Sequence, residues 1–481
     1  MSEPPPEDLA KIEKWQQARL QKKQRAEYQF KMVQLADTIN ANTTTPSQIS
    51  SVRVEGTRTT RPSFLKFLID PLIPTPNAEN DLESSIKTAA RIADTLKLTG
   101  IFRSVDARLE RAQSPRAGPF DVDVVLRARE YGKFRVKAAT DISGENSGST
   151  SLDATIRNVF GGGETLTANA SVGTATTKAF NAAFTVPLTP SLWTRGELQA
   201  FVSETDFTKS ASCTEGIRGV RALVRNGAVG HGMHELAYNA VLRNIGRLLP
   251  EASMAIRQEA GPSLKSSLSH TFVLDKRDDS LMPTKGFYLR TLNEVAGLGG
   301  DAAFVKSEVD AKISRPLFPG ISVSFAARSG VILGLFGKWT LFSDRFHLGG
   351  PTSIRSFRAS GMGPRDAHLS SSTTTGADSL GGEVFWAAGL SVISDLPLRP
   401  QWPLKAHGWL NAGRLDNVDR SVPSSETIVN LLRKPSVSAG VGLIYTLPPA
   451  RLELNFGVPL VASRSDAIRR GLQVGIGLEF L

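Results

Sequence analysis

A polar, glycine-rich stretch from Arg345 to Asp366 carries the side chains best suited to specific recognition. Glycines permit tight turns at both of its ends. Between them stands Arg355, which is permanently charged, has five N–H donors and therefore suits an enclosed polar partner. The alternative is a surface loop with a solvated arginine. The candidate residues of this loop are Gly349, Gly350, Ile354, Arg355, Phe357, Gly363, Arg365 and Asp366.

Residues for covalent or metal chemistry are sparse. Cys213 is the single cysteine, and we interpret it as a small wall or core residue. His231 and His234 form the closest histidine pair in the sequence and are better explained as polar loop or lumen residues than as metal ligands. We therefore predict no enzyme, no catalytic residues, no cofactor and no metal site.

The charge balance points to lipid or an acidic partner. The 481 residues include 57 Lys and Arg against 46 Asp and Glu, a formal net charge of +11. The basic residues are dispersed and do not alternate with aromatic ones, so we expect no nucleic acid partner. The acidic, proline-rich start argues against a secretory signal. No run of about 18 apolar residues predicts a transmembrane helix, but barrel strands need only about ten alternating residues.

The chain divides into three predicted parts. Residues 1–48 form a charged helical arm, because helix formers dominate between Leu9 and Asn40. Residues 49–130 read as strand, two helices and two strands, a small α+β domain. In residues 131–481 the helical period gives way to about sixteen strand-like segments, with a long loop at 337–380.

The third part predicts an all-β transmembrane barrel of about 16 antiparallel strands. Several segments alternate apolar and polar residues, as in Leu166–Val172 and Ile321–Ala327. Short joints and long polar loops also alternate, which is typical of outer-membrane barrels. The alternative is a soluble all-β protein, although no fixed internal repeat is present.

Three stretches resemble the bacterial surface antigen/BamA superfamily of outer-membrane barrel assembly proteins. The loop at Phe346–Phe357, with Gly361–Asp366, is similar to the signature loop of that family. Upstream, Asp275–Asp278 and Pro283–Gly286 with Glu294–Asp301 resemble its eighth and ninth strands. Downstream, Ser379–Leu390 and Trp409–Gly413 are most similar to the mitochondrial branch. The small domain resembles a POTRA (polypeptide-transport-associated) domain, notably at Gly100–Val105, although any small α+β module is an alternative.

The resemblance implies the core barrel subunit of the mitochondrial sorting and assembly machinery, the SAM complex. Such a protein would insert and fold β-barrel precursors into the mitochondrial outer membrane, with its POTRA-like domain facing the intermembrane space. The implied partners are β-barrel precursors, accessory subunits of the complex and membrane lipid. Two alternatives remain: a passive pore of an organelle outer membrane, and a protein-translocating channel of the plastid envelope.

The resemblance also assigns roles to single residues. It implies that Arg355, flanked by Ile354 and Phe357, points back into the lumen and braces the wall. The usual motif has glycine where Ser356 stands, so the local backbone is expected to differ slightly. In bacterial relatives the arginine meets acidic wall residues, and the matching places here are Ser391 and Asn411.

The last strand resembles a mitochondrial β-signal, through Gln473, Gly475, Leu478 and Phe480. An ordinary closing strand also alternates in this way. It must pair with the first barrel segment, Phe134–Ile142, to close the barrel. Incomplete pairing would leave backbone N–H and C=O groups exposed at a seam, and we predict that precursors are templated there by strand addition.

Overall fold

The computed structural model describes residues 40–477, except 75–80, 116, 144–146, 174–175, 370–375, 397–401, 419–431 and 448–449, together with Arg19, Lys23, Phe30, Val33, Gln34, Asp37 and Thr38. The chain forms two compact units, Met1–Tyr131 and Gly132–Leu481. Most of the helical arm predicted for residues 1–48 lies outside the described residues.

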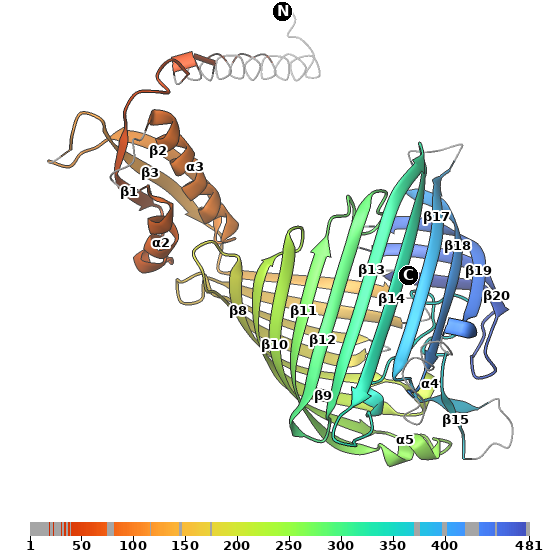
Figure 1. The fold of residues 1–481 in the computed structure, drawn as a ribbon. Coiled ribbons are helices and arrows are strands. Elements are labelled where there is room, and N and C mark those ends of the chain that lie inside the picture. The colour runs from red at the N-terminus through yellow and green to blue at the C-terminus, as the bar shows by residue number, and fades with distance from the viewer. Residues whose placement is uncertain are drawn as a thin grey trace, which may run out of the picture. The chain divides into compact units, whose positions relative to one another are not determined.

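The first unit has a three-stranded sheet with helices between its first two strands (Figure 1). Strand β3 is central, parallel to β1 and antiparallel to β2. Its elements are β1 (Gln48–Glu55), α2 (Pro62–Ile69), the 3-10 turn η1 (Asp70–Leu72), α3 (Leu82–Leu98), β2 (Phe102–Arg111) and β3 (Asp121–Glu130).

Helical spacing of small and apolar residues explains how α3 covers the sheet. Ala89, Ile92 and Leu96 recur at three- and four-residue intervals and are buried. Leu126 on β3 is equally buried. Gly100 follows the helix with φ +70°, a conformation that glycine adopts without steric cost.

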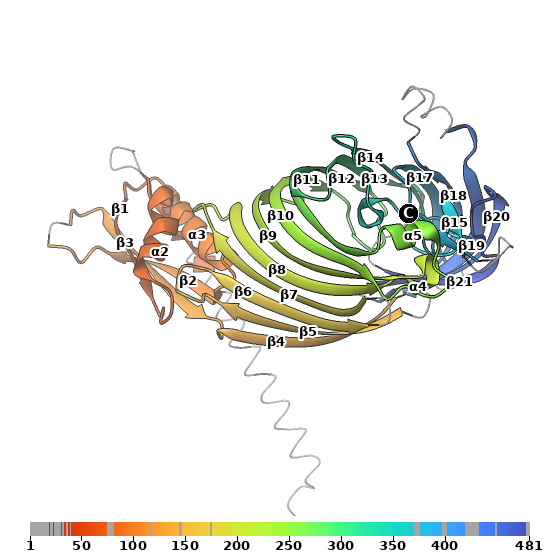
Figure 2. The ribbon, with the colours of Figure 1, turned by 90° about the horizontal axis from the view of Figure 1, so that it is seen from below.

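The second unit is a 16-stranded antiparallel sheet that curves into a barrel wall, as the sequence predicts (Figures 1 and 2). The sheet begins at β4 and ends at β21, each strand pairing with the next in space. The strands are β4 (Phe134–Ser143), β5 (Ser147–Arg157), β6 (Thr165–Gly173), β7 (Thr176–Pro187), β8 (Thr194–Asp206), β9 (Thr214–Ala228), β10 (Gly232–Gly246), β11 (Gly261–Asp275), β12 (Gly286–Gly300), β13 (Phe304–Phe318), β14 (Ile321–Gly334), β17 (Val384–Asp395), β18 (Leu404–Asp416), β19 (Ser436–Leu447), β20 (Ala450–Val461) and β21 (Gly471–Gly477).

Alternation along the strands separates an apolar outside from a polar inside. On β20, Leu454 and Phe456 are exposed, whereas Glu453 and Asn455, which alternate with them, are buried. The same pattern on neighbouring strands produces a wall with an apolar outer band, as a barrel in lipid requires. None of the helices in the described residues is long and apolar enough to cross a membrane.

The barrel has two different rims. We call the rim at which β4 begins the entry rim, and the rim at which β4 ends the loop rim. The loop rim carries two short helices that the sequence analysis missed, α4 (Thr208–Ala211) and α5 (Met254–Gln258). It also carries the connection from β14 to β17, which contains the predicted long loop (Figure 1).

That connection, residues 335–383, is called the lumen loop below. It holds a 3-10 turn, η2 (Phe342–Asp344), and a two-stranded sheet of β15 (Arg365–Ala367) and β16 (Ala377–Ser379). Neither was predicted, because each is too short to show a period.

Candidate functional site

One end of the lumen loop is fixed to the wall of β10 by an ion pair. The Arg243 guanidinium donates to both carboxylate oxygens of Asp344, at 2.8 and 2.7 Å. Both side chains are buried. The geometry is bidentate, which adds directional specificity to the charge interaction.

Two lysines of the wall reinforce this anchor. Lys265 Nζ lies 3.4 Å from an Asp344 carboxylate oxygen, and Lys306 Nζ donates to the Asp344 backbone carbonyl at 3.1 Å. Burial opposes ionisation of Asp344, but the hydrogen bonds and charge of Arg243, with the two lysines, hold its pKa below the ordinary value. The carboxylate is therefore ionised in the folded protein at neutral pH.

The centre of the lumen loop is fixed to the other side of the barrel by Arg355. Its Nε and one terminal nitrogen donate to a single oxygen of Glu453 on β20, at 3.2 and 2.8 Å. The other terminal nitrogen donates to Asn411 on β18 at 3.2 Å, and the guanidinium lies 5.4 Å from the ring centre of Trp409. Arg355 and Glu453 are both fully buried. The arginine thus points into the wall, and Asn411 is one of its partners.

The sequence analysis missed the acidic partner. Glu453 lies on β20, whereas the resemblance placed the contact at Ser391 on β17 and Asn411 on β18. Arg451 and Glu453 form a second ion pair on the same face of β20. The alternation Arg451, Glu453, Asn455 within an otherwise apolar strand was a detectable signal of a polar inner face.

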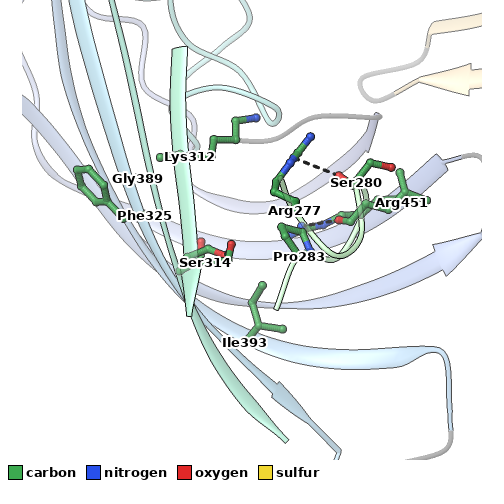
Figure 3. A pocket seen from close by; sticks show the side chains of 13 residues that line it. Arg277, Ser280, Pro283, Lys312, Ser314, Phe325, Gly389, Ile393 and Arg451 are labelled. Carbon is green, nitrogen blue, oxygen red and sulfur yellow. Dashed lines mark hydrogen bonds between the residues drawn. The ribbon is translucent and has the colours of Figure 1, made fainter. Parts of the chain in front are cut away.

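A turn from the entry rim meets the same polar cluster. Residues 276–285 join β11 to β12, and Arg451 donates to the Leu281 carbonyl at 3.2 Å. Met282 packs with Ile393 and Ile444 of the inner wall. A small cavity of about 50 Å³ lies under this turn (Figure 3). Ser391, the other predicted partner of Arg355, lines that cavity.

The predicted glycines do supply special backbone conformations. Gly349, Gly350 and Gly363 have φ values of +106°, +118° and +96°. A Cβ on Gly349 would lie 2.7 Å from the Arg358 carbonyl oxygen, so a side chain there is excluded. Ser356 has φ +68°, so this serine keeps a conformation that glycine adopts more readily.

Apolar side chains fill the space beside Arg355. Ile354 and Phe357 are fully buried in a cluster with Phe304 of β13, Ile332 of β14 and Leu415 of β18. This packing explains why the motif places apolar residues on both sides of the arginine. It holds the loop against β13, β14 and β18 of the wall.

Arg365 and Asp366 lie at the loop rim, away from Arg355. Asp366 accepts from the backbone N–H of Ala255 in α5 at 3.1 Å. Arg365 begins β15, and burial lowers its pKa from the ordinary value. These two residues belong to the contacts between the lumen loop and the loop rim.

The lumen loop is also tied to the last barrel strand. Gln473 of β21 accepts from the Ser356 N–H at 2.8 Å and donates to the Phe357 carbonyl at 3.3 Å. Gln473 and Gly475 face inward and are buried. Leu478 and Phe480, the remaining residues of the predicted signal, lie outside the described residues.

The first and last strands meet without a regular ladder. Cα atoms of β4 and β21 approach within 8 Å. Within their described residues, β21 pairs with β20 and β4 with β5, but no hydrogen-bonded ladder joins β4 to β21. The side chains of Phe134 and Val136 on β4 are exposed. This seam presents strand edges that can accept another strand.

No arrangement for covalent chemistry emerges from the described residues. Cys213 is buried, which raises its pKa to about 12, so its thiol is unreactive. Ser212 and His368 both approach one oxygen of Asp378, at 2.6 and 3.1 Å. His368 Nε2 is also the nitrogen that faces the Ser212 hydroxyl, at 3.5 Å, so one nitrogen faces both groups, unlike the histidine of a Ser-His-Asp triad. Nor do three or more His, Cys, Asp or Glu side chains gather as metal ligands in the part of the chain described.

Comparisons with known proteins match this architecture. Residues 158–480 match the model of the Omp85 superfamily domain. A SAM50-like protein of Schizosaccharomyces pombe is 34% identical over 464 residues, 95% of each chain. The human sorting and assembly machinery component 50 homolog is 33% identical over 411 residues, 84% of this chain and 85% of that protein. BamA of Haemophilus ducreyi lacking POTRA domains 1–3 has a similar fold, with a TM-score of 0.75 and 16% identity over 90% of this chain and 84% of that one.

Proposed function

Since the chain belongs to the Omp85 superfamily and to its family of sorting and assembly machinery component 50 homologues, we propose that it inserts β-barrel precursors into the mitochondrial outer membrane. These matches confirm the family membership that the loop motif predicted. The proposed mechanism is strand addition at the seam between β4 and β21, which makes and breaks no covalent bond.

The seam is the observation that carries this mechanism. Among the described residues, one edge of β4 has no ladder partner, so it offers backbone donors and acceptors to the last strand of a precursor. In lipid these groups have no alternative partner, so each new backbone hydrogen bond favours addition. Later hairpins of the precursor then extend the sheet until the new barrel closes on itself and leaves.

The lumen loop has a distinct role in this proposal. It is anchored to β10 through Asp344, to β20 through Arg355 and to β21 through Gln473. Hydrogen bonds to Gln473 hold the last strand from the inside, while residues 471–477 of that strand form no ladder with β4. The loop therefore keeps β20 and β21 in place when the seam is occupied by a precursor.

We also propose a role for the first unit and further binding partners. Its order of strand, two helices and two strands fits a POTRA-like domain, which would face the intermembrane space. Strands β1 and β2 are the edges of its sheet, and in the described residues the outer side of each pairs with no strand and is open to a precursor strand. Accessory subunits of a sorting and assembly complex and membrane lipid are the further partners we propose.

A seam-locking experiment tests the mechanism. Cys213 is first replaced by alanine. Each variant then receives two cysteines, one within Phe134–Ala138 and one within Gly471–Gly477. A short reducible crosslinker between them should lower insertion of a radiolabelled barrel precursor into isolated mitochondria by about tenfold or more. Reduction of the crosslink should restore insertion.

A crosslink inside a regular ladder is the matched control. Leu443 of β19 and Leu454 of β20 are directly paired and face outward. Locking this pair should leave insertion unchanged. Full insertion with a quantitatively locked seam would reject strand addition between β4 and β21.

A further inference from the structure

The outer surface of the barrel from β8 to β13 carries polar side chains where lipid-facing positions are normally apolar. On β10 and β11, exposed Leu236 and Leu268 share the outer face with His234 and His270. On β12, Asn293 is exposed two residues from the outward Val295. Six such residues are together called the outer polar row: Thr194, Asn226, His234, His270, Asn293 and Ser307.

The row takes one residue from each of six adjacent strands. Thr194 of β8 is paired with Asn226 of β9, which is paired with His234 of β10. His234 reaches His270 of β11 diagonally, with 3.2 Å between Nδ1 and Nε2.

Beyond the histidines the row continues to β13. His270 is paired with Asn293 of β12, and Asn293 with Ser307 of β13. Apart from a two-residue step between His234, which is paired with Phe272, and His270, the row therefore runs perpendicular to the strands. At about 4.8 Å per strand its length is about 24 Å.

Part of the row lies at the depth of the hydrocarbon core. Asn293 is the eighth of the 15 residues of β12, at its midpoint. His270 is the tenth of the 15 residues of β11. Because the middle of a barrel strand crosses the middle of the bilayer, these two side chains face lipid tails.

Contacts within the row leave hydrogen-bonding groups unused. The Ser307 hydroxyl donates to the side-chain amide oxygen of Asn293 at 2.9 Å, and the Thr194 hydroxyl donates to that of Asn226 at 3.4 Å. In the described part of the chain, the Asn293 side-chain N–H groups have no acceptor. Lipid tails offer none, and a polar group without a partner in hydrocarbon is costly.

Beside the seam, the described residues of β19 and β20 form no such row. The outward residues of β19 and β20 include Val441, Leu443, Leu454, Phe456 and Val458, all exposed. The outer polar row lies on the opposite side, since β11 and β12 are the eighth and ninth of sixteen strands from β4. A partner bound there would not obstruct the seam.

We propose that the outer polar row docks a transmembrane helix of another protein. A helix laid along the row repeats every 5.4 Å, close to the 4.8 Å between strands, so one helix residue per turn meets one row residue per strand. The row has no Asp, Glu, Lys or Arg, so its partner offers Ser, Thr, Asn or Gln side chains that hydrogen-bond without ion pairs. A second barrel would instead present mainly apolar side chains.

This inference rests on membrane insertion of the barrel and not on strand addition at the seam. A photoreactive amino acid replaces Leu268, beside His270, in the full-length protein in mitochondria. We expect a discrete adduct whose crosslinked peptide, identified by mass spectrometry, lies in a transmembrane helix. The same probe at Val441 is the control and should not give this adduct.

The double variant His270→Leu and Asn293→Leu tests the row itself. Leucine suits a lipid-facing position, so the barrel should fold, and heat-dependent gel mobility verifies this. Adduct yield from Leu268 should fall by about tenfold or more, because several hydrogen bonds in the membrane are lost together. Ser307→Ala alone should lower it by a smaller factor.

Three results would overturn the inference: adducts with lipid alone, an adduct within a strand of another barrel, or a yield that the double variant does not change. Precursor insertion is measured in the same mitochondria. Normal insertion combined with any of these results rejects the docked helix and leaves the proposed function standing.

Discussion

The guanidinium of Arg355, in the lumen loop, donates twice to the carboxylate of Glu453, on the strand next to the last. Neither side chain is exposed to solvent. The loop and the wall beside the seam are thus joined by a buried ion pair. Arg451 binds the other oxygen of the same carboxylate and also the turn of residues 276–285. Elements from both rims therefore converge on Glu453.

Arg355→Ala is expected to destabilise the barrel by about 3 kcal/mol, because it leaves part of a buried carboxylate without its partner. Urea unfolding of the barrel in lipid vesicles, followed by tryptophan fluorescence, measures this. Arg358→Ala is the matched control, since Arg358 is an exposed arginine of the same loop, and it should change stability by less than about 0.5 kcal/mol. If both variants lowered the free energy of unfolding equally, the buried ion pair would contribute no more to stability than an exposed arginine.

The Asp344 anchor predicts a dependence on pH. Its pKa is lowered in the folded protein, so its contribution to stability is complete above the ordinary aspartate value near 4 and is lost as pH falls through the lower folded value. The barrel should therefore lose stability below about pH 4. Asp344→Asn should remove this part of the acid dependence, as urea midpoints between about pH 2 and 6 would reveal. If the urea midpoints of Asp344→Asn fell with pH as those of the unchanged protein do, Asp344 would not be the group that causes the acid dependence.

Ser356→Gly should stabilise the barrel by about 1 kcal/mol. The substitution relieves a left-handed conformation that costs a serine about 1–2 kcal/mol, and it removes a buried hydroxyl that has no partner among the described residues. Greater backbone freedom of glycine in the unfolded chain offsets part of the gain. Ser360→Gly, at another left-handed but less buried serine, should gain less. A lower urea midpoint for Ser356→Gly would contradict this account.

In the first unit, Glu130 holds the segment before α2. Its carboxylate accepts from the backbone N–H and the hydroxyl groups of Thr59 and Thr60, at 2.7–3.2 Å. Glu130→Ala should therefore speed hydrogen exchange at these two amides by about tenfold or more. Amides in the centre of β3, such as Leu126, serve as the internal control and should keep their rates. Unchanged exchange at Thr59 and Thr60 would show that the contacts do not order the segment.

The sequence predicted those features that depend on repeated local patterns. Alternation at Leu166–Val172 and Ile321–Ala327 located strands, because the inner and outer faces of the wall have opposite polarity. The loop at Arg355 was recognisable because its glycines and its flanking apolar residues each have a steric or packing role. Short elements such as α4, α5, β15 and β16 show no period and were missed.

Contacts between distant segments could not be read from spacing. Glu453 lies 98 residues from Arg355 in the chain, and their meeting depends on how the lumen loop folds across the barrel. The same holds for Arg243 with Asp344, and for the turn at Leu281 with Arg451. The outer polar row likewise becomes visible when the strand register is known, because its residues come from six separate strands.

Site-specific crosslinking at the seam tests the central claim most directly. Single cysteines are placed along Phe134–Ile142 in the Cys213→Ala background, and one cysteine is placed in the final strand of an arrested precursor in isolated mitochondria. Strand addition predicts crosslinks that advance residue by residue in a single register. Val295, outward on β12, is the control position and should give none. Absence of crosslinks along β4, while the precursor still reaches the membrane, would contradict templating at the seam.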